Sequence, residues 1–225
     1  MKKQIFVMGG GGFTSDSSLK LERYLLSLCK KQNPKICFLP QASNESREYI
    51  LKFYQSFLSL GAQPSWISLF GNVQDSWKEQ LLNSDIIYVG GGNTRSMLAL
   101  WREWGVDVVL RQAYEQGVIL SGLSAGMLCW FDWGITDSVK PLGVVAGLGL
   151  ISGTGCPHYD TEPDRPPYFE ESVSAGIVPT GYALYDHTGA LFIDGLFAKA
   201  VKSRAGKKVK FIDKDKVSTI ETDFL

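Results

Sequence analysis

The sequence of 225 residues lacks the features that mark several broad classes of protein. Its 23 Lys and Arg balance its 23 Asp and Glu, and the lack of a basic excess argues against nucleic acid as a partner. No run approaches the ~20 apolar residues that a membrane helix requires, so no membrane partner is expected. The four cysteines are widely spaced without a C-x-x-C pair, which predicts a reducing cytoplasm and no zinc site.

A secretory signal is also missing from the first residues. The apolar run at 4–8 is shorter than a signal-peptide core, and no cleavage site of small residues follows it. We therefore expect this run to form the first buried strand of a cytoplasmic protein.

Apolar runs alternate with segments of helical periodicity along most of the chain. Strands are predicted at 4–8, 35–40, 65–70, 85–92 and 117–126. Helices are predicted at 17–31 with Ser17 as a cap, at 43–61, at 76–84, at 94–117 with a break near Gly105, and from 125 onward. This alternation indicates an α/β fold, a mostly parallel sheet with helices on both faces. The last 80 residues favour β-hairpins that complete one edge of the sheet, and residues 1–225 are predicted to form a single domain.

Three glycine-rich turns follow predicted strands, at 9–12, 90–94 and 121–126. Because ligands of parallel sheets bind at the carboxyl ends of the strands, these turns are expected to converge on one crevice. The first turn is not a dinucleotide fingerprint, since Ser15 stands where G-x-G-x-x-G requires its third glycine. No acidic residue closes the second strand and no P-loop pattern occurs, so the sequence predicts no nucleotide site.

The third turn contains the pattern G-x-S-x-G at 122–126. A serine on a sharp strand-to-helix turn exposes its Oγ, which makes Ser124 a candidate nucleophile. The N–H of Ala125 at the helix N-terminus would stabilise an oxyanion, with a second donor from Gly91 or Gly92. The alternative is that Ser124 only caps the helix.

An activated serine needs a base, and the sequence holds two histidines. His158 lies in a Gly/Pro-bounded loop and is the candidate base, whereas His187 lies in a predicted hairpin turn. Triad members meet in space, so spacing leaves the orienting acid open among Asp137, Asp160, Glu162 and Asp186. The separation of only 34 positions between Ser124 and His158 argues against an α/β-hydrolase and favours a flavodoxin-like, amidotransferase type of site.

Four blocks in order, YVGGGNT, GLSAGM, TDS and PHYD, resemble the peptidase E family of serine peptidases, which is related to the cyanophycinases. The resemblance spans most of the chain. It implies a class I glutamine-amidotransferase-like fold and the hydrolysis of short peptides after an N-terminal Asp. By motif, Ser124 resembles the nucleophile, His158 the base and Asp137 the third member of the triad. Gly92 and Ala125 resemble the oxyanion-hole donors.

The resemblance also implies an arginine that binds the side chain of the substrate Asp, and Arg165 is the candidate. Gly91 and Asn93 are further candidates for substrate binding. The alternative for Arg165 is a surface ion pair with Asp164 or Glu162.

Short peptides are therefore the expected partners of a monomer or homodimer, and no cofactor or metal is expected. Two alternatives differ in class from a dipeptidase with a preference for N-terminal Asp. The first is a cyanophycinase-like peptidase or an amidase of the same fold. The second is a binding protein that kept the fold and lost catalysis.

Overall fold

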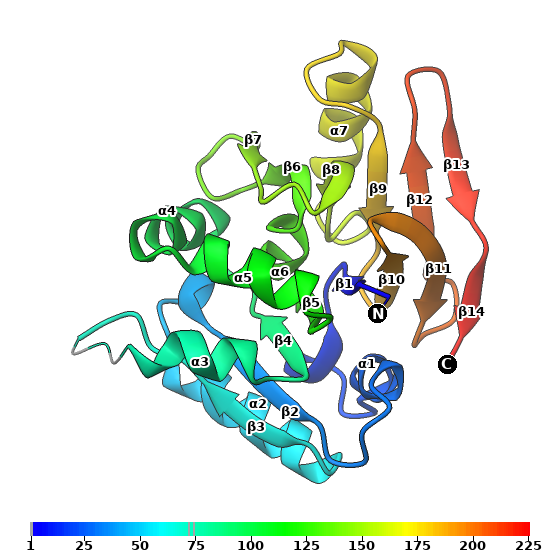
Figure 1. The fold of residues 1–225 in the computed structure, drawn as a ribbon. Coiled ribbons are helices and arrows are strands. Elements are labelled where there is room, and N and C mark those ends of the chain that lie inside the picture. Colours follow the sequence, from blue (N-terminus) through cyan, green and yellow to red (C-terminus); the bar gives the residue numbers. More distant parts are fainter. Residues whose placement is uncertain (1, 72, 74) are drawn as a thin grey trace.

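The computed structural model describes residues 2–71, 73 and 75–225. Within these residues the strands form two sheets, one of eight strands and one of six (Figure 1). The first sheet has the order β14-β11-β10-β1-β5-β4-β2-β3, and the second has the order β13-β12-β9-β8-β6-β7. In the described part of the chain, no helix combines the length and apolar character needed to cross a membrane.

The first sheet is built around five parallel strands and is extended at one side by strands from the C-terminal part of the chain. The parallel strands are β1 (Gln4–Met8), β5 (Ile119–Leu123), β4 (Ile86–Val89), β2 (Lys35–Leu39) and β3 (Gln63–Trp66). Beyond β1 the sheet continues with β10 (Thr188–Ile193), β11 (Leu196–Lys202) and β14 (Thr222–Phe224). Because β10 runs antiparallel to β1, this extension makes the sheet mixed.

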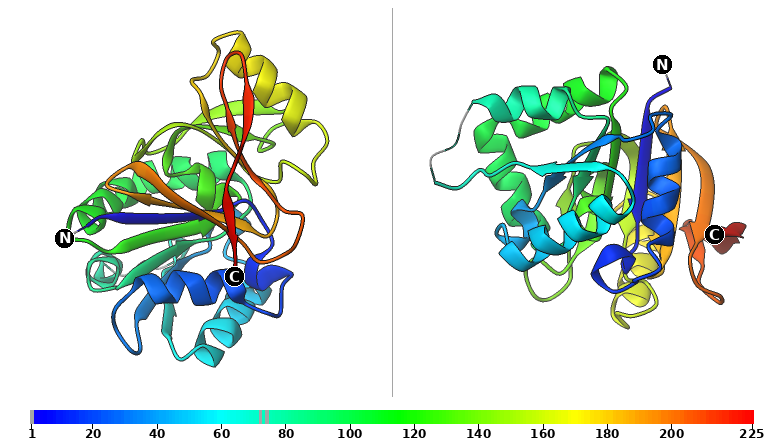
Figure 2. Two further views of the ribbon diagram at one scale, coloured as in Figure 1. Left: turned by 90° about the vertical axis from the view of Figure 1, so that its right-hand side faces the viewer. Right: turned by 90° about the horizontal axis from the view of Figure 1, so that it is seen from below.

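Helices cover both faces of the first sheet (Figures 1 and 2). One face packs on η1 (Gly12–Thr14), α1 (Lys20–Leu28) and α2 (Arg47–Ser59). The other packs on α3 (Ser76–Leu82), α4 (Thr94–Trp104) and α5 (Val106–Glu115), with η2 (Gln41–Ser43) beside α4. Successive strand residues point to opposite faces, so Phe6 lies in one core with Phe53 while Val7 lies in the other with Trp101.

The second sheet follows the short helix α6 (Ala125–Leu128). Its strands are β6 (Phe131–Thr136), β7 (Gly143–Ala146), β8 (Ile151–Cys156), β9 (Gly181–Leu184), β12 (Val209–Ile212) and β13 (Val217–Ile220). Helix α7 (Arg165–Ser174) packs on this sheet through a third apolar cluster that includes Phe169, Ile135 and Ile212. The left view of Figure 2 shows the red hairpin β12–β13 rising from the first sheet toward α7.

The predicted α/β alternation is confirmed, including strand 4–8 and the break between α4 and α5 at Gly105. Helix α1 begins later than predicted, because Leu19 takes a left-handed conformation and replaces Ser17 as the N-terminal boundary. The C-terminal strands do more than complete one edge of the sheet. In the first sheet β5 has β1 and β4 as its neighbours, and the other side of β1 is paired with β10. The strands that directly follow β5 therefore pair with one another in the second sheet.

Candidate active site

Ser124 lies at the sharp turn between β5 and α6. Its backbone has φ 55° and ψ −114°, a strained conformation that costs a non-glycine residue about 1–3 kcal/mol. The flanking glycines allow the close packing of this turn, because a Cβ at Gly122 would lie 2.7 Å from the carbonyl oxygen of Val89. Ser124 occupies the N-cap position of α6, yet its side chain makes no capping hydrogen bond to the described residues. Helix capping therefore does not account for this serine.

The end of β1 is bonded to the backbone of both the serine and the histidine. The N–H of Ser124 donates to the carbonyl oxygen of Met8 at 3.2 Å. The N–H of His158 donates to the next carbonyl oxygen, that of Gly9, also at 3.2 Å. Two residues that are far apart in the chain are thus fixed on consecutive carbonyl groups of one strand end.

His158 contacts the carboxylate of Asp186, with 2.7 Å between Nδ1 and Oδ1. The contact follows from the second sheet, in which β8 and β9 are parallel neighbours. His158 stands two residues beyond the end of β8, and Asp186 stands two residues beyond the end of β9. The two side chains are 22% and 20% exposed, so solvent can reach the pair from one side.

Further hydrogen bonds orient the Asp186 carboxylate and its backbone. The hydroxyl of Thr161 donates to Oδ2 of Asp186 at 3.2 Å, and the N–H of Asp186 donates to Asp160 at 2.8 Å. Burial opposes ionisation, but the hydrogen bond and charge of His158 outweigh it and hold the pKa of Asp186 below its ordinary value. An ionised Asp186 stabilises the N–H at Nδ1 of His158, which leaves Nε2 to accept a proton.

The four carboxylates considered as orienting acid differ in what they contact. Among the described residues, Asp186 is the carboxylate that His158 contacts. Asp137 lies instead against Arg165, with 3.3 Å between Oδ1 and Nη2. Asp160 accepts from the amide of Asp186 and pairs with Lys207. Glu162, the fourth candidate, contacts the same arginine as Asp137 does.

Arg165 is held by three partners inside the structure. Its Nε donates to Glu162 at 2.6 Å, its Nη1 to the carbonyl oxygen of Ile135 at 2.7 Å, and its Nη2 to Asp137 at 3.3 Å. The side chain is only 2% exposed, against 40% for Glu162 and 60% for Asp137. The ion pair with Glu162 that the sequence left as an alternative is therefore present, although Arg165 is buried rather than on the surface.

Among the described residues, Gly92 of the loop at 90–94 has an amide without a hydrogen bond. The N–H of Gly91 donates to the hydroxyl of Tyr49 at 3.1 Å, and the N–H of Asn93 donates to the carbonyl oxygen of Ala42 at 2.7 Å. Gly92, at φ 135°, has no side chain to collide with that same carbonyl group. Within residues 2–71, 73 and 75–225, the amides of Gly92 and Ala125 donate no hydrogen bond, which leaves both available to an oxyanion.

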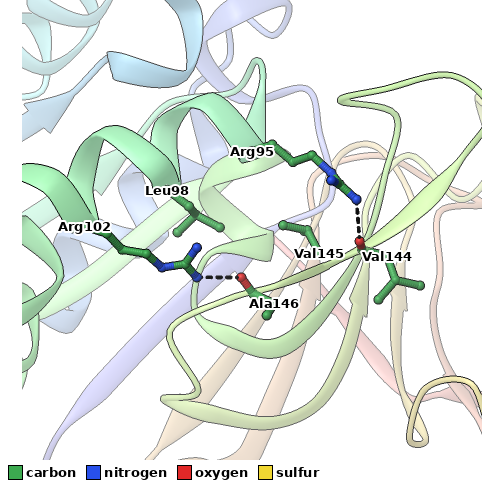
Figure 3. Close-up of a pocket in the computed structure, with 6 residues that line it drawn as sticks. All are labelled: Arg95, Leu98, Arg102, Val144, Val145 and Ala146. Carbon is green, nitrogen blue, oxygen red and sulfur yellow. Dashed lines mark hydrogen bonds between the residues drawn. The ribbon is translucent and has the colours of Figure 1, made fainter.

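Asn93 fixes a neighbouring loop. Its Oδ1 accepts from the N–H of Ser96 at 2.9 Å and caps α4, and its Nδ2 donates to the carbonyl oxygen of Ser138 at 3.1 Å. Figure 3 shows how α4 also holds the strand after that loop: Arg95 and Arg102 donate to the backbone carbonyl oxygens of Val144 and Ala146. The Asn93 side chain thus caps α4 through Oδ1 and holds Ser138 near the N-terminus of this helix through Nδ2.

Sequence reasoning missed the close approach at Gly10. A Cβ at this position would overlap the carboxylate of Asp186 and would lie 2.5 Å from Cε1 of His158. The run of four consecutive glycines was the available signal, because such a run permits backbone to pass close beneath side chains. In the described residues, His, Cys, Asp and Glu form no group of three or more that could hold a metal ion.

A serine on a strand-to-helix elbow beside a His–Asp pair is typical of serine hydrolases built on α/β folds. Residues 5–201 match the sequence model of peptidase family S51. The chain belongs to this family, in agreement with the resemblance to peptidase E.

Three relatives show the extent of the likeness. The uncharacterised peptidase YgaJ of Bacillus subtilis (strain 168) is 45% identical over 207 residues, which cover 92% of this chain and 90% of YgaJ. A peptidase from an acI-B1 Actinobacterium superposes with a TM-score of 0.75 at 15% identity, covering 99% of this chain and 95% of the other. A Listeria monocytogenes EGD-e protein, provisionally named peptidase E, superposes with a TM-score of 0.67 at 19% identity, covering 91% and 100%. The solved structures support the fold, and the family supports a serine peptidase.

Proposed function

We propose that the chain is a serine peptidase that hydrolyses short peptides with Ser124 as nucleophile, His158 as base and Asp186 as the orienting acid. The observation that carries the proposal is the 2.7 Å contact between Nδ1 of His158 and Asp186, next to the strained elbow of Ser124. Asp186 takes the role that the motif resemblance gave to Asp137, because Asp137 is engaged with Arg165.

The proposed reaction has two steps. Nε2 of His158 accepts the proton of Ser124 Oγ while Oγ attacks the carbonyl carbon of the scissile peptide bond. His158 then gives this proton to the leaving amine, and an acyl-enzyme remains on Ser124. Water, deprotonated by His158, attacks the acyl carbon, and Oγ recovers its proton as the acid product leaves. Asp186 stabilises the imidazolium that forms in each step.

The amides of Gly92 and Ala125 are the proposed oxyanion donors. Both are without hydrogen-bond partners among the described residues, and Ala125 opens helix α6. Gly91 is removed from this role, because its N–H is already bonded to Tyr49. Losing one oxyanion donor costs on the order of 10²–10³ in turnover, so the two amides would supply much of the rate enhancement.

A substrate with N-terminal Asp is the first specificity to test. Arg165 is the cation near the site that the family resemblance assigns to the substrate carboxylate, but Glu162 and Asp137 already neutralise its charge. An incoming carboxylate would take the place of Asp137, since this partner is the more distant and the more exposed of the two. We therefore propose a preference for peptides with N-terminal Asp, which requires the substrate carboxylate to replace Asp137 at Arg165.

The experiment compares hydrolysis of Asp-Leu, Glu-Leu, Asn-Leu, Ala-Leu and a β-Asp-Leu isopeptide by wild type and Ser124→Ala. Cleavage of Asp-Leu alone, lost in the variant, would support the full proposal. Cleavage of several peptides would support a serine peptidase and would contradict a preference for N-terminal Asp. Cleavage of the isopeptide alone would favour a cyanophycinase-like peptidase or an amidase. No cleavage by wild type would contradict the proposal and favour a binding protein.

A further inference from the structure

The two histidines of the chain lie on either side of the glycine run that ends β1. Gly10 passes beneath the ring of His158, as described above. A Cβ at the next residue, Gly11, would lie 2.7 Å from Nδ1 of His187. The second histidine faces its own carboxylate, that of Asp16, with 3.5 Å between Nδ1 and Oδ2. A second Asp–His pair thus stands behind the proposed catalytic pair, separated from it by two glycines.

His187 is adjacent in sequence to Asp186 and fixes the turn that presents it. Its φ is 64°, in the left-handed region that non-glycine residues rarely adopt. Its N–H donates to the carbonyl oxygen of Gly10 at 3.0 Å, and its carbonyl oxygen accepts from the N–H of Ser203 at 2.9 Å. The residue is only 7% exposed. These two backbone hydrogen bonds therefore hold His187 in a left-handed conformation that histidine rarely adopts.

Asp16 is itself firmly placed. Its Oδ1 accepts from the N–H and the hydroxyl of Ser18 at 3.0 and 2.7 Å, and its Oδ2 accepts from the hydroxyl of Ser203 at 3.2 Å. Nδ1 of His187 is fully buried and makes no hydrogen bond within the described part of the chain, so the Asp16 carboxylate is the polar group that it faces. The carboxylate can accept a hydrogen bond from a protonated Nδ1 after only a small shift of either side chain.

We propose that His187, held by Asp16, is a positioning residue that keeps Asp186 aimed at His158. The inference rests on the proposed function, in which Asp186 orients the base. The ring of His187 packs on Gly11, and its backbone is bonded to Gly10, so movement of this ring displaces both the turn and the glycines beneath the catalytic pair. Burial and the charge of Arg204 lower the pKa of His187, which keeps its ring neutral at neutral pH.

The kinetic test uses His187→Asn and Asp16→Asn. Asparagine tolerates a positive φ, so His187→Asn removes the ring while the backbone preference is largely kept. Each variant is expected to lower kcat by about tenfold with KM within twofold of wild type, because displacement of a catalytic group by a fraction of an ångström slows the chemical step. A kcat within twofold of wild type in both folded variants would overturn the proposal.

Asp85→Asn is the matched control. Its side chain is 11% exposed, as is that of Asp16, and it too pairs with a basic side chain, that of Lys31. It precedes β4, at the opposite end of the parallel strands from Ser124. This variant is expected to leave kcat at the wild-type value, and an equal loss of kcat would overturn a specific role for Asp16.

Nuclear magnetic resonance supplies a readout that does not depend on activity. The chain has only two histidines, so the imidazole nitrogen spectrum of wild type contains two ring systems, and His187→Asn assigns them. The proposal predicts a proton on Nδ1 of His187, and a downfield Nδ1 proton of His158 that moves in Asp16→Asn but not in Asp85→Asn. A proton on Nε2 of His187 instead, or an unmoved His158 signal, would overturn it.

The kinetic and the spectroscopic measurements together distinguish failure of this inference from failure of the proposed function. If wild type cleaves no peptide, the proposed function fails, while the spectrum still decides whether His187 and Asp16 govern the His158–Asp186 contact. If wild type cleaves peptides and loses activity in Ser124→Ala, normal kinetics in His187→Asn and Asp16→Asn would overturn the positioning role alone. If both variants fail to fold, the wild-type position of the His187 proton decides.

Discussion

His158 and Asp186 meet where two parallel neighbours, β8 and β9, end at the same edge of the second sheet, with 2.7 Å between Nδ1 and Oδ1. The carboxyl ends of neighbouring parallel strands lie at the same edge of a sheet, so residues that follow these strands are brought close together. The N–H of His158 also bonds to Gly9, which places this edge of the second sheet at the carboxyl ends of the first. The candidate site is therefore a junction of the two sheets.

The identity of the orienting acid leads to the first prediction. Asp186→Asn should lower kcat by about 10³–10⁴-fold with KM little changed, because an amide no longer fixes the tautomer of His158. Asp137→Asn is the matched control, since it alters a carboxylate that contacts Arg165 and not His158. Steady-state kinetics on the best peptide would measure both variants. A larger loss in Asp137→Asn than in Asp186→Asn would contradict the assignment.

The second prediction concerns the backbone beneath the pair. Gly10→Ala should lower kcat more than tenfold, because the new methyl group overlaps the carboxylate of Asp186 and crowds His158. Gly143→Ala in β7 is the control, since a Cβ there meets nothing within 4 Å. Circular dichroism and thermal unfolding would separate loss of activity from loss of fold. Wild-type turnover in a folded Gly10→Ala protein would show that the close approach has no catalytic consequence.

The third prediction concerns the fully buried Glu22 of α1. Its Oε1 accepts from the N–H of Phe13 at 2.6 Å, whereas its buried Oε2 has no partner among the described residues. Burial is the main cause that raises the pKa of Glu22 from 4.5 to about 7, and the nearby Asp16 carboxylate adds to it. The phenols of Tyr49 and Tyr88 lie close enough to interact with the same group.

The sign of the pH effect follows from the raised pKa of Glu22. Between pH 4.5 and about 7 the folded state keeps a proton that the unfolded state has lost. The associated stabilisation, about 3 kcal/mol, is complete below the unfolded pKa and is lost as pH rises through the folded one. Urea unfolding of wild type should therefore show stability falling between about pH 4.5 and pH 7, and Glu22→Gln should flatten this dependence. The same slope in both proteins would argue against a buried, protonated Glu22.

Sequence patterns were enough to place the elements that carry Ser124. The strand–helix alternation and the G-x-S-x-G turn are local features, and β5 and α6 occur where these patterns predict them. The turns at 9–12, 90–94 and 121–126 also lie together, since a Cβ at Gly91 would be 3.3 Å from that of Ser124 and one at Gly12 would be 3.5 Å from Leu123. Their convergence follows from the parallel sheet.

The orienting acid could not be read in the same way. Asp186 reaches His158 only because β8 pairs with β9, and such pairing between distant segments leaves no local pattern in one sequence. Arg165 illustrates the same limit: the sequence left open whether it binds substrate or pairs on the surface with Asp164 or Glu162, whereas the structure buries it between Glu162, Asp137 and a backbone carbonyl. Glu22 gave no signal either, because helical spacing does not distinguish a buried carboxyl from an exposed one.

The most direct test of the central claim is covalent labelling with a fluorophosphonate, followed by mass spectrometry to locate the modified residue. The account predicts a single modification at Ser124 in wild type, abolished in His158→Ala and slowed in Asp186→Asn. The probe reads the activated nucleophile itself and requires no knowledge of the natural peptide. Failure of wild type to label, or modification at another residue with Ser124 untouched, would contradict the assignment of Ser124 as nucleophile.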